Sequence, residues 1–244
     1  MTRALKIFAF ATVLALALPG QAYISSGIQL VENMSAKRAK LNLRDVSAQL
    51  TAEVDTIDTP VEERIFVKSP ERLRLVQERP EQTVVYVERE GARARGSEQS
   101  LKKLSGKSTE MLAALLMPRG ADNGSKATRL ISLLRGIGVN TKVTSLGIYG
   151  DDVRNTAYII GARSWETDKP QLWIDRESFQ PVRLVMNADG ILHESRFIGY
   201  GSPAGGAWFP ETIENYRDGK LVRRSRLNEI RTNEDLPETL FAIP

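Results

Sequence analysis

The stretch QLWIDRESFQPVRLVM at residues 171–186 contains two apolar runs that a short polar connection separates. Both runs are rich in β-branched and aromatic residues, which favour strands. Pro181 begins the second run, and proline suits the first residue of a strand because its missing N–H costs no ladder bond there. Within that run Val182, Leu184 and Met186 point to one side, because side chains alternate along a strand. The stretch therefore predicts two strands, each with one apolar face.

Runs of the same kind fill most of the chain. They predict about eleven strands, at 46–54, 63–69, 72–78, 83–90, 142–150, 156–163, 169–175, 181–188, 191–200, 211–219 and 220–231. The connections between them are short and hold turn residues, as at Asp218 and Gly219. Parallel neighbours would need connections of about a dozen residues or more, so we expect the strands to be antiparallel.

Three helices are predicted beside the strands. The segment 28–41 spaces its apolar residues at helical intervals. The segments 108–118 and 125–138 each begin near a serine that can cap a helix, and a proline or glycine ends each. Because the last two interrupt the series of strands, we expect 108–118 and 125–137 to form a helical lid across the mouth of the sheet. The alternative is that they complete a permanent core.

Strands with one apolar face can bury it in two ways. Two sheets can pack together, or one sheet can curl around its own interior, which side chains or a guest molecule must then fill. No low-complexity segment or long linker interrupts the chain, so residues 23–244 are expected to form a single domain. The predicted fold class is mainly β with α, of the α+β type.

Residues 1–22 have the organisation of a signal peptide. Arg3 and Lys6 give a positive start, an apolar core extends to Leu18, and small residues lead to a cleavage site near Ala22. The chain has no cysteine, so it lacks the residue that carries the acyl chains of a bacterial lipoprotein. We therefore expect a periplasmic protein without a lipid anchor and without disulfides.

Side chains that carry catalysis or bind metals are sparse. The chain has 34 Lys and Arg against 30 Asp and Glu, and these charges are interspersed, so no nucleic-acid partner is expected. His193 is the only histidine, which is too few for a metal site or a triad. GYGSPA at 199–204 fits the spacing of a dinucleotide loop, but no helix follows it. We expect no enzyme activity, no metal and no cofactor.

The chain contains RIFVKSPERLRL at 64–75 and, from Leu172 to its end, a run that includes AWFPETIENYRDGK and LPETLFAIP. In this order these motifs resemble the LolA/LolB-like superfamily of bacterial periplasmic lipoprotein carriers and outer-membrane lipoprotein-sorting proteins. The resemblance implies an unclosed antiparallel β-barrel, covered by helices, whose apolar interior accepts acyl chains. In the carriers an arginine latches the lid, and Ser69 stands at that position here, with Arg72 and Arg74 as candidates to replace it.

The resemblance implies a soluble carrier that binds the acyl chains of a lipoprotein or lipid and transfers them toward the outer membrane. We expect a monomer that works with an inner-membrane donor protein and an outer-membrane acceptor protein. The residues expected to line the lipid-binding cavity are Val67 or Phe66, Leu73, Leu75, Val85, Met111, Leu115, Ile131, Leu134, Val182, Leu184 and Met186. The alternative function is an envelope sensor or interaction module that binds a signalling protein through a groove or a sheet edge.

Overall fold

The computed structural model describes residues 24–68, 72–79, 82–89, 92–97, 100–103, 115, 125–188, 190–201 and 208–243. These residues form one antiparallel sheet of 13 strands, in the order β6-β5-β4-β3-β2-β1-β13-β12-β11-β10-β9-β8-β7. They also form the helices α1 (Gly27–Ala39) and α3 (Ser125–Gly136) and a final 3₁₀ helix, η2 (Glu238–Phe241).

Most strands are five to ten residues long. In chain order they are β1 (Asp45–Val54), β2 (Ile57–Lys68), β3 (Arg72–Glu78), β4 (Thr83–Arg89), β5 (Ala92–Ser97), β6 (Ser100–Lys103), β7 (Thr144–Ile148), β8 (Thr156–Ile160), β9 (Gln171–Asp175), β10 (Pro181–Ala188), β11 (Ile191–Ile198), β12 (Thr212–Arg217) and β13 (Lys220–Thr232). Each pairs with its neighbours in the chain, apart from β6 with β7, so the connections are hairpins rather than crossovers.

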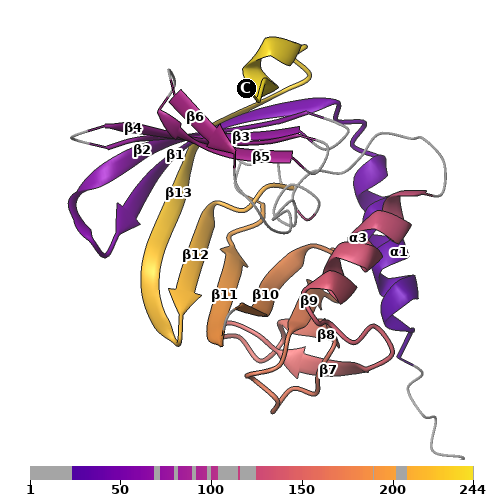
Figure 1. Cartoon of the computed structure of the whole chain (residues 1–244). Coiled ribbons are helices and arrows are strands. Elements are labelled where there is room, and N and C mark those ends of the chain that lie inside the picture. The colour runs from indigo at the N-terminus through magenta and orange to yellow at the C-terminus, as the bar shows by residue number, and fades with distance from the viewer. Residues whose placement is uncertain are drawn as a thin grey trace, which may run out of the picture.

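Two meanders make up the sheet, β1 to β6 and β7 to β13, and the pairing of β1 with β13 joins them. Figure 1 shows the joined sheet strongly curved, with α1 and α3 side by side at one end of it. β6 and β7 are the two edges of the sheet and do not pair with each other. The prediction of a mainly β protein with an unclosed antiparallel barrel and helices is therefore confirmed.

The sequence predicts about eleven strands, and the sheet has 13. β5 and β6 were missed because ARARGS alternates only alanine with arginine and SLKK is short, and neither contains the β-branched or aromatic residues that favour strands. The helix predicted at 125–138 is α3. The helix predicted at 108–118 lies outside the described residues except for Leu115, which is helical and buried, and the export signal predicted at 1–22 also lies outside them.

α1 begins where the sequence predicts a helix. The Ser26 hydroxyl caps it by accepting a hydrogen bond from the backbone N–H of Gln29 at 3.3 Å. Gly27 allows the helix start to lie close to Thr141, in the segment before β7. A Cβ at position 27 would lie 2.6 Å from the carbonyl oxygen of Thr141. The helix start is thus fixed both by its cap and by its contact with the segment before β7.

The apolar side chains divide between the two faces of the sheet. The main cluster packs one face, which we call the concave face, against α1 and α3. On the opposite, convex face, Val76, Val85 and Val87 pack under Leu236 and Phe241 of the C-terminal segment. A third cluster also lies on the convex face, where Ala157, Ile159, Trp173 and Val182 pack together. The C-terminal segment therefore covers β3 and β4 from outside, while the helices cover the sheet from inside.

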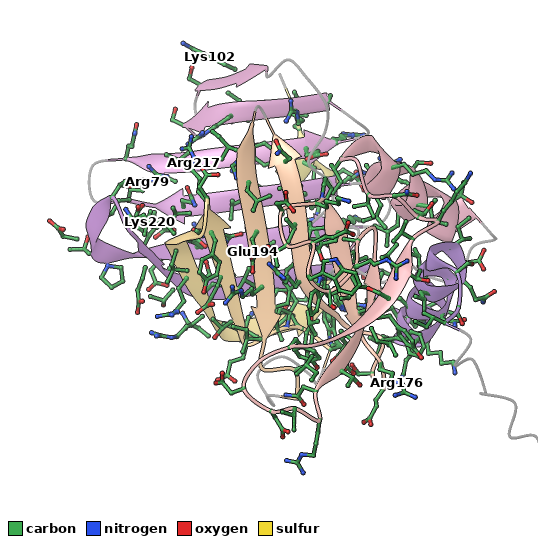
Figure 2. The ribbon with its side chains drawn as sticks, turned by 90° about the horizontal axis from the view of Figure 1, so that it is seen from below. Arg79, Lys102, Arg176, Glu194, Arg217 and Lys220 are labelled. Carbon is green, nitrogen blue, oxygen red and sulfur yellow. The ribbon has the colours of Figure 1, made fainter. Side chains whose placement is uncertain are left out.

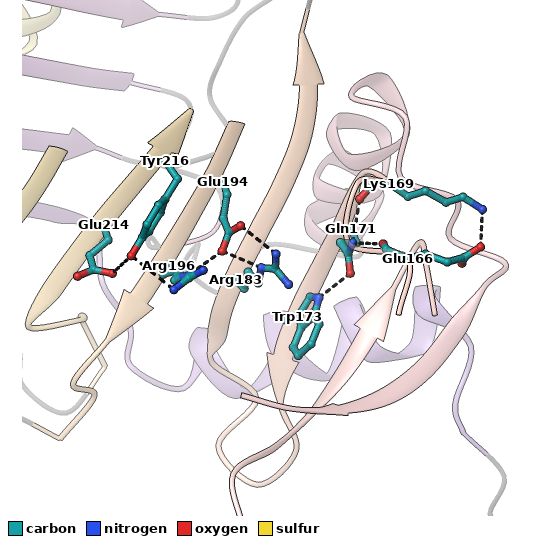
Figure 3. A network of polar contacts seen from close by, with 9 residues as sticks. All are labelled: Glu166, Lys169, Gln171, Trp173, Arg183, Glu194, Arg196, Glu214 and Tyr216. Atoms are coloured by element: carbon teal, nitrogen blue, oxygen red, sulfur yellow. Dashed lines mark hydrogen bonds and ion pairs between the residues drawn. The ribbon is translucent and has the colours of Figure 1, made fainter. Parts of the chain in front are cut away.

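A ladder of polar contacts crosses the convex face from β10 to β12 (Figure 3). Glu194 accepts two hydrogen bonds from Arg183, each of 2.9 Å, and a further bond from Arg196. The Arg196 guanidinium lies 4.4 Å from the centre of the Tyr216 ring, and the Tyr216 hydroxyl donates to Glu214 at 2.7 Å. Burial acts to raise the pKa of Glu194, but the two arginines outweigh it and hold that pKa below its usual range. The ladder is a stabilising feature of the outer face.

Replacing Glu194 by Gln is expected to make the stability of the protein less dependent on pH. A carboxyl group whose pKa is lowered by folding stabilises the protein above its unfolded pKa, and this contribution is lost as the pH falls through the folded value. Glu194→Gln should lower the free energy of unfolding at pH 7 by about 1–3 kcal/mol and reduce the further loss below about pH 4. Urea unfolding at several pH values measures both effects.

The control for this prediction is Glu229→Gln. The Glu229 side chain is 46 % exposed in its pair with Arg231, so its removal should change stability by less than about 1 kcal/mol. If Glu194→Gln destabilised the protein equally at pH 7 and at acid pH, the carboxylate of Glu194 would not be the source of the pH dependence.

Candidate functional site

The concave face is apolar where it meets the helices. Antiparallel residues in register lie on the same face, so the pairing identifies which side chains point inward. Val46, Val67 and Leu73 stand opposite one another on β1, β2 and β3, and all three belong to the main cluster. On the other meander Leu184 of β10 stands opposite Leu172 of β9, again in that cluster. Both meanders therefore contribute to one apolar zone.

The helices cover this apolar zone. Leu30 and Met34 of α1 are buried in the main cluster, as are Ile131 and Leu134 of α3. Leu115, which precedes α3 in the chain, is also fully buried there. In the conformation described, the zone is thus enclosed between the sheet and helical side chains rather than between two sheets.

The structure brings together seven of the residues expected to line the cavity. Six of them belong to the main cluster and Leu75 packs against it, the six being Val67, Leu73, Leu115, Ile131, Leu134 and Leu184. The alternative to Val67, Phe66, packs against the convex cluster. Met186 is partly exposed, and Met111 lies outside the described residues.

Two of the expected lining residues lie on the convex face. Val85 stands opposite Val76, and both are buried under Phe241, so the alternation along β4 turns Tyr86 inward instead. Val182 belongs to the cluster around Trp173, because the register between β10 and β9 shifts between Pro181 and Arg183. A bulge of this kind changes the face on which a side chain lies, and the sequence pattern does not reveal it.

Further along the same strands the concave face becomes polar. The Glu63 side chain has no exposed surface, and Gln77 donates to one of its oxygens at 2.7 Å. Arg223 and Ser225 donate to the other oxygen, and Arg79 donates to the Gln77 amide oxygen at 3.0 Å. We call these five residues the polar band. Because the buried carboxylate is paired with Arg223 and accepts hydrogen bonds on both oxygens, the band connects β3, β2 and β13 without leaving Glu63 as an isolated charge.

The polar surface continues onto the second meander. Arg223 stands opposite Asn215, which stands opposite Ser195, and the Ser195 hydroxyl lies 2.9 Å from the Asn215 amide oxygen. In the next row Arg217 stands opposite His193, which stands opposite Met186. His193 is partly exposed and lies on the concave face, outside the apolar zone.

A buried arginine connects α1 to the segment that precedes α3. Arg38 is 5 % exposed, and its Nη1 donates to the carbonyl oxygen of Leu115. Burial lowers the pKa of Arg38, and the nearby Tyr200 opposes this shift. Burial also raises the pKa of Tyr200, whose hydroxyl donates to the carbonyl oxygen of Pro181 at 2.7 Å. The contact holds the two parts of the helical cover together.

The described residues hold no group of three or more His, Asp and Glu side chains that is able to bind a metal ion. Within the same ranges, no helix has both the length and the apolar character needed to cross a membrane. The polar residues of the concave face are dominated by arginine, amide and hydroxyl groups, which suit ligand binding through charge and hydrogen bonds.

Two functional features were missed in the sequence although each leaves a signal. In ERIFVK, Glu63 has the same parity as Ile65 and Val67, which places a carboxylate on the apolar side of a strand. In α1, Arg38 follows Met34 by four residues, which places it on the buried side of the helix. In both cases the signal is a charged residue at a position that the pattern assigns to the apolar side of its strand or helix.

No family model matches the sequence, and no curated protein matches it. Solved structures are similar in fold. A LolA superfamily protein from Nitrosomonas europaea has a TM-score of 0.52 at 13 % identity, over 90 % of this chain and 99 % of that chain. A putative outer membrane lipoprotein-sorting protein domain from Vibrio parahaemolyticus has a TM-score of 0.54 at 10 % identity, over 88 % and 95 %. At such identities the likeness is one of fold, and it confirms what the sequence motifs imply: the chain has a LolA/LolB-like fold.

Proposed function

We propose that the protein is a periplasmic carrier that binds the acyl chains of a lipoprotein or lipid and performs no catalysis. The observation that carries this proposal is the apolar zone, where one face of an open sheet gathers apolar side chains from both meanders. Each buried methylene of an acyl chain contributes about 0.8 kcal/mol, so binding there needs no specific polar chemistry. The fold shared with a lipoprotein-sorting protein domain supports the same function.

The proposed lining keeps the inward residues of the sheet and helices. It consists of Val67, Leu73, Leu75, Leu115, Ile131, Leu134 and Leu184, together with Met111. α3 packs on this zone in the conformation described, so an acyl chain enters only when α3 moves away from the sheet. Release requires that α3 or a partner weaken this burial, because a carrier that held its cargo at full strength would not deliver it.

The proposed carrier is exported by the signal at 1–22, acts in the periplasm as a monomer, and exchanges cargo with a donor protein and an acceptor protein. The absence of cysteine from the sequence supports a carrier without a lipid anchor. The sequence also holds a single histidine, which supports a function in binding rather than in acid–base catalysis.

One observation favours a second candidate function, an interaction module for a protein partner. β7 forms an edge of the sheet, and no second strand among the described residues pairs with its outer side. Leu146 and Ile148 of this strand are 38 % and 56 % exposed, although they share the concave face with Tyr158, which packs against the main cluster, and with the buried Ile160 of β8. An extended segment of a partner would fit such an edge by adding a strand. Saturable binding of a partner peptide that is lost in Ile148→Pro tests this alternative.

Leu134→Asp is expected to abolish uptake of a fluorescent fatty acyl probe. Leu134 is fully buried in the main cluster, so a carboxylate there introduces a charge where the acyl chain would lie. Fluorescence titration measures the uptake, and circular dichroism establishes that the variant is folded at the temperature of the titration.

Two variants are matched controls for Leu134→Asp. Ser132→Asp introduces the same charge on the exposed side of α3 and should leave uptake unchanged. Val85→Ala removes a buried side chain from the convex cluster, so it should lower stability by about 2 kcal/mol without loss of uptake. Normal uptake by Leu134→Asp would contradict the proposed lining.

Arg38→Met is expected to loosen the helical cover. The change removes the charge-assisted hydrogen bond to the Leu115 carbonyl, and such bonds contribute about 1.5–3 kcal/mol. Peptides that contain Leu115 should therefore exchange their amide hydrogens about tenfold faster or more, and the acyl probe should enter faster. Lys37→Met is the control, because Lys37 is exposed and bonds instead to the carbonyl of Glu177 at 2.7 Å. Unchanged exchange in Arg38→Met would exclude this role.

A further inference from the structure

Cations gather on the concave face at the edge formed by β5 and β6. The pairing places Leu75, Tyr86, Arg95 and Lys102 in one row across β3, β4, β5 and β6. Tyr86 and Leu75 pack against the main cluster, so Arg95 and Lys102 share the inward face with them. The row therefore changes from apolar to cationic on a single face.

Arg95 and Lys102 stand directly opposite each other, and both are exposed. Like charges in this position destabilise a sheet. Among the residues that the structure describes, neither has an ion pair with an acidic side chain. The arrangement costs stability unless an anion lies between or beside the two groups.

Two further cations on the same face are not neutralised. Arg79 bonds through its side chain to the Gln77 amide, and within the described ranges its Nε is buried without a hydrogen-bond partner. Arg217 is exposed and has no ion pair with any described residue. By contrast Arg223 is paired with Glu63, and Lys220 lies 3.1 Å from Asp55. Figure 2 shows Arg79, Lys102 and Arg217 on the side of the molecule away from α1.

We propose that Arg79, Arg95, Lys102 and Arg217, which we call the cationic rim, bind the anionic, phosphate-bearing headgroup of the amphiphile. The inference rests on the proposed function, since the acyl chains of that amphiphile lie on the apolar zone of the same face. Two buried carboxylates on this face, those of Glu63 and Glu88, are already bonded within the sheet, to Arg223 and to Tyr86, so they do not compete with a ligand for the four cations of the rim. The rim thereby selects an anionic headgroup over a zwitterionic one.

A neighbouring groove does not suit the same headgroup. A space of about 230 Å³ lies between the β1–β2 and β12–β13 hairpins. Its lining includes three carboxylates, those of Glu53, Asp55 and Asp58, beside Arg223 and Arg224. Carboxylates repel a phosphate, so the charge distribution assigns the headgroup to the rim rather than to this groove.

The test compares phosphatidylglycerol with phosphatidylcholine of the same acyl chains, each as vesicles and at two salt concentrations. The wild-type protein should extract the anionic lipid about tenfold more efficiently at low salt, and the difference should shrink at about 0.5 M NaCl because exposed charges are screened. The triple variant Arg95→Gln, Lys102→Gln and Arg217→Gln should lose the preference and keep its extraction of phosphatidylcholine.

A matched triple variant controls for net charge. Arg176→Gln, Arg226→Gln and Arg231→Gln removes three exposed cations outside the rim and should keep the preference. The rim variant should also be at least as stable as the wild type to urea, because it relieves the opposition of Arg95 and Lys102. An equal loss of preference in both triple variants would overturn the rim as the headgroup site.

The remaining outcomes separate this inference from the function on which it rests. Extraction of both lipids with equal efficiency would overturn the cationic rim but leave the acyl carrier intact. Extraction of neither lipid would overturn the proposed function itself. If inorganic phosphate at millimolar concentration bound to the rim and left lipid extraction unchanged, the rim would be a site for the free anion, which would overturn its assignment to a lipid headgroup.

Discussion

The ladder between β1 and β13 runs from Val46 opposite Thr232 to Val54 opposite Arg223, and it joins the first strand of the sheet to the last. Without it, the chain would form two separate meanders, each with an uncovered apolar face. With it, the inward faces of both meanders become one continuous surface, which α1 and α3 cover. The right-handed twist of so many strands curves this surface, while the two edge strands β6 and β7 do not pair with each other and so leave the barrel open.

This single surface has two chemical zones, and the order of residues along each strand produces them. On β2 the inward residues change from Val67 and Ile65 to Glu63, and on β12 they change from Ile213 to Asn215 and Arg217. The apolar residues lie at the ends of the strands near the helices. An amphiphile has the same two-part character, so the proposed ligand matches the surface in both charge and hydrophobicity. The hydrogen bonds that the buried Glu63 carboxylate accepts allow the two zones to adjoin, because they compensate its charge beside the apolar zone.

Much of this fold follows from the sequence, because alternation and short turns are local properties. PVRLVMNA is β10 at the residues predicted, and the predicted helix at 125–138 is α3. The sequence did not reveal features that depend on the partner strand. The bulge near Pro181 turns Val182 outward, and the docking of the C-terminal segment gives Val85 an apolar environment on the convex face. β5 was not predicted because ARARGS has charged residues where a half-buried strand usually has apolar ones. That its arginines share a face with Tyr86 and Glu88 is seen only once the pairing with β4 is known.

The proposed carrier holds an acyl chain on the inward face, between the two meanders and the helices. A fatty acid with a photoreactive group at the end of its chain can locate this site, because the cross-linked residues can be identified by mass spectrometry. We expect cross-links to Leu73, Leu184 and the residues of α3 that belong to the main cluster. Cross-links confined to the convex cluster around Phe241, or none above the level of an unrelated protein, would contradict this proposal.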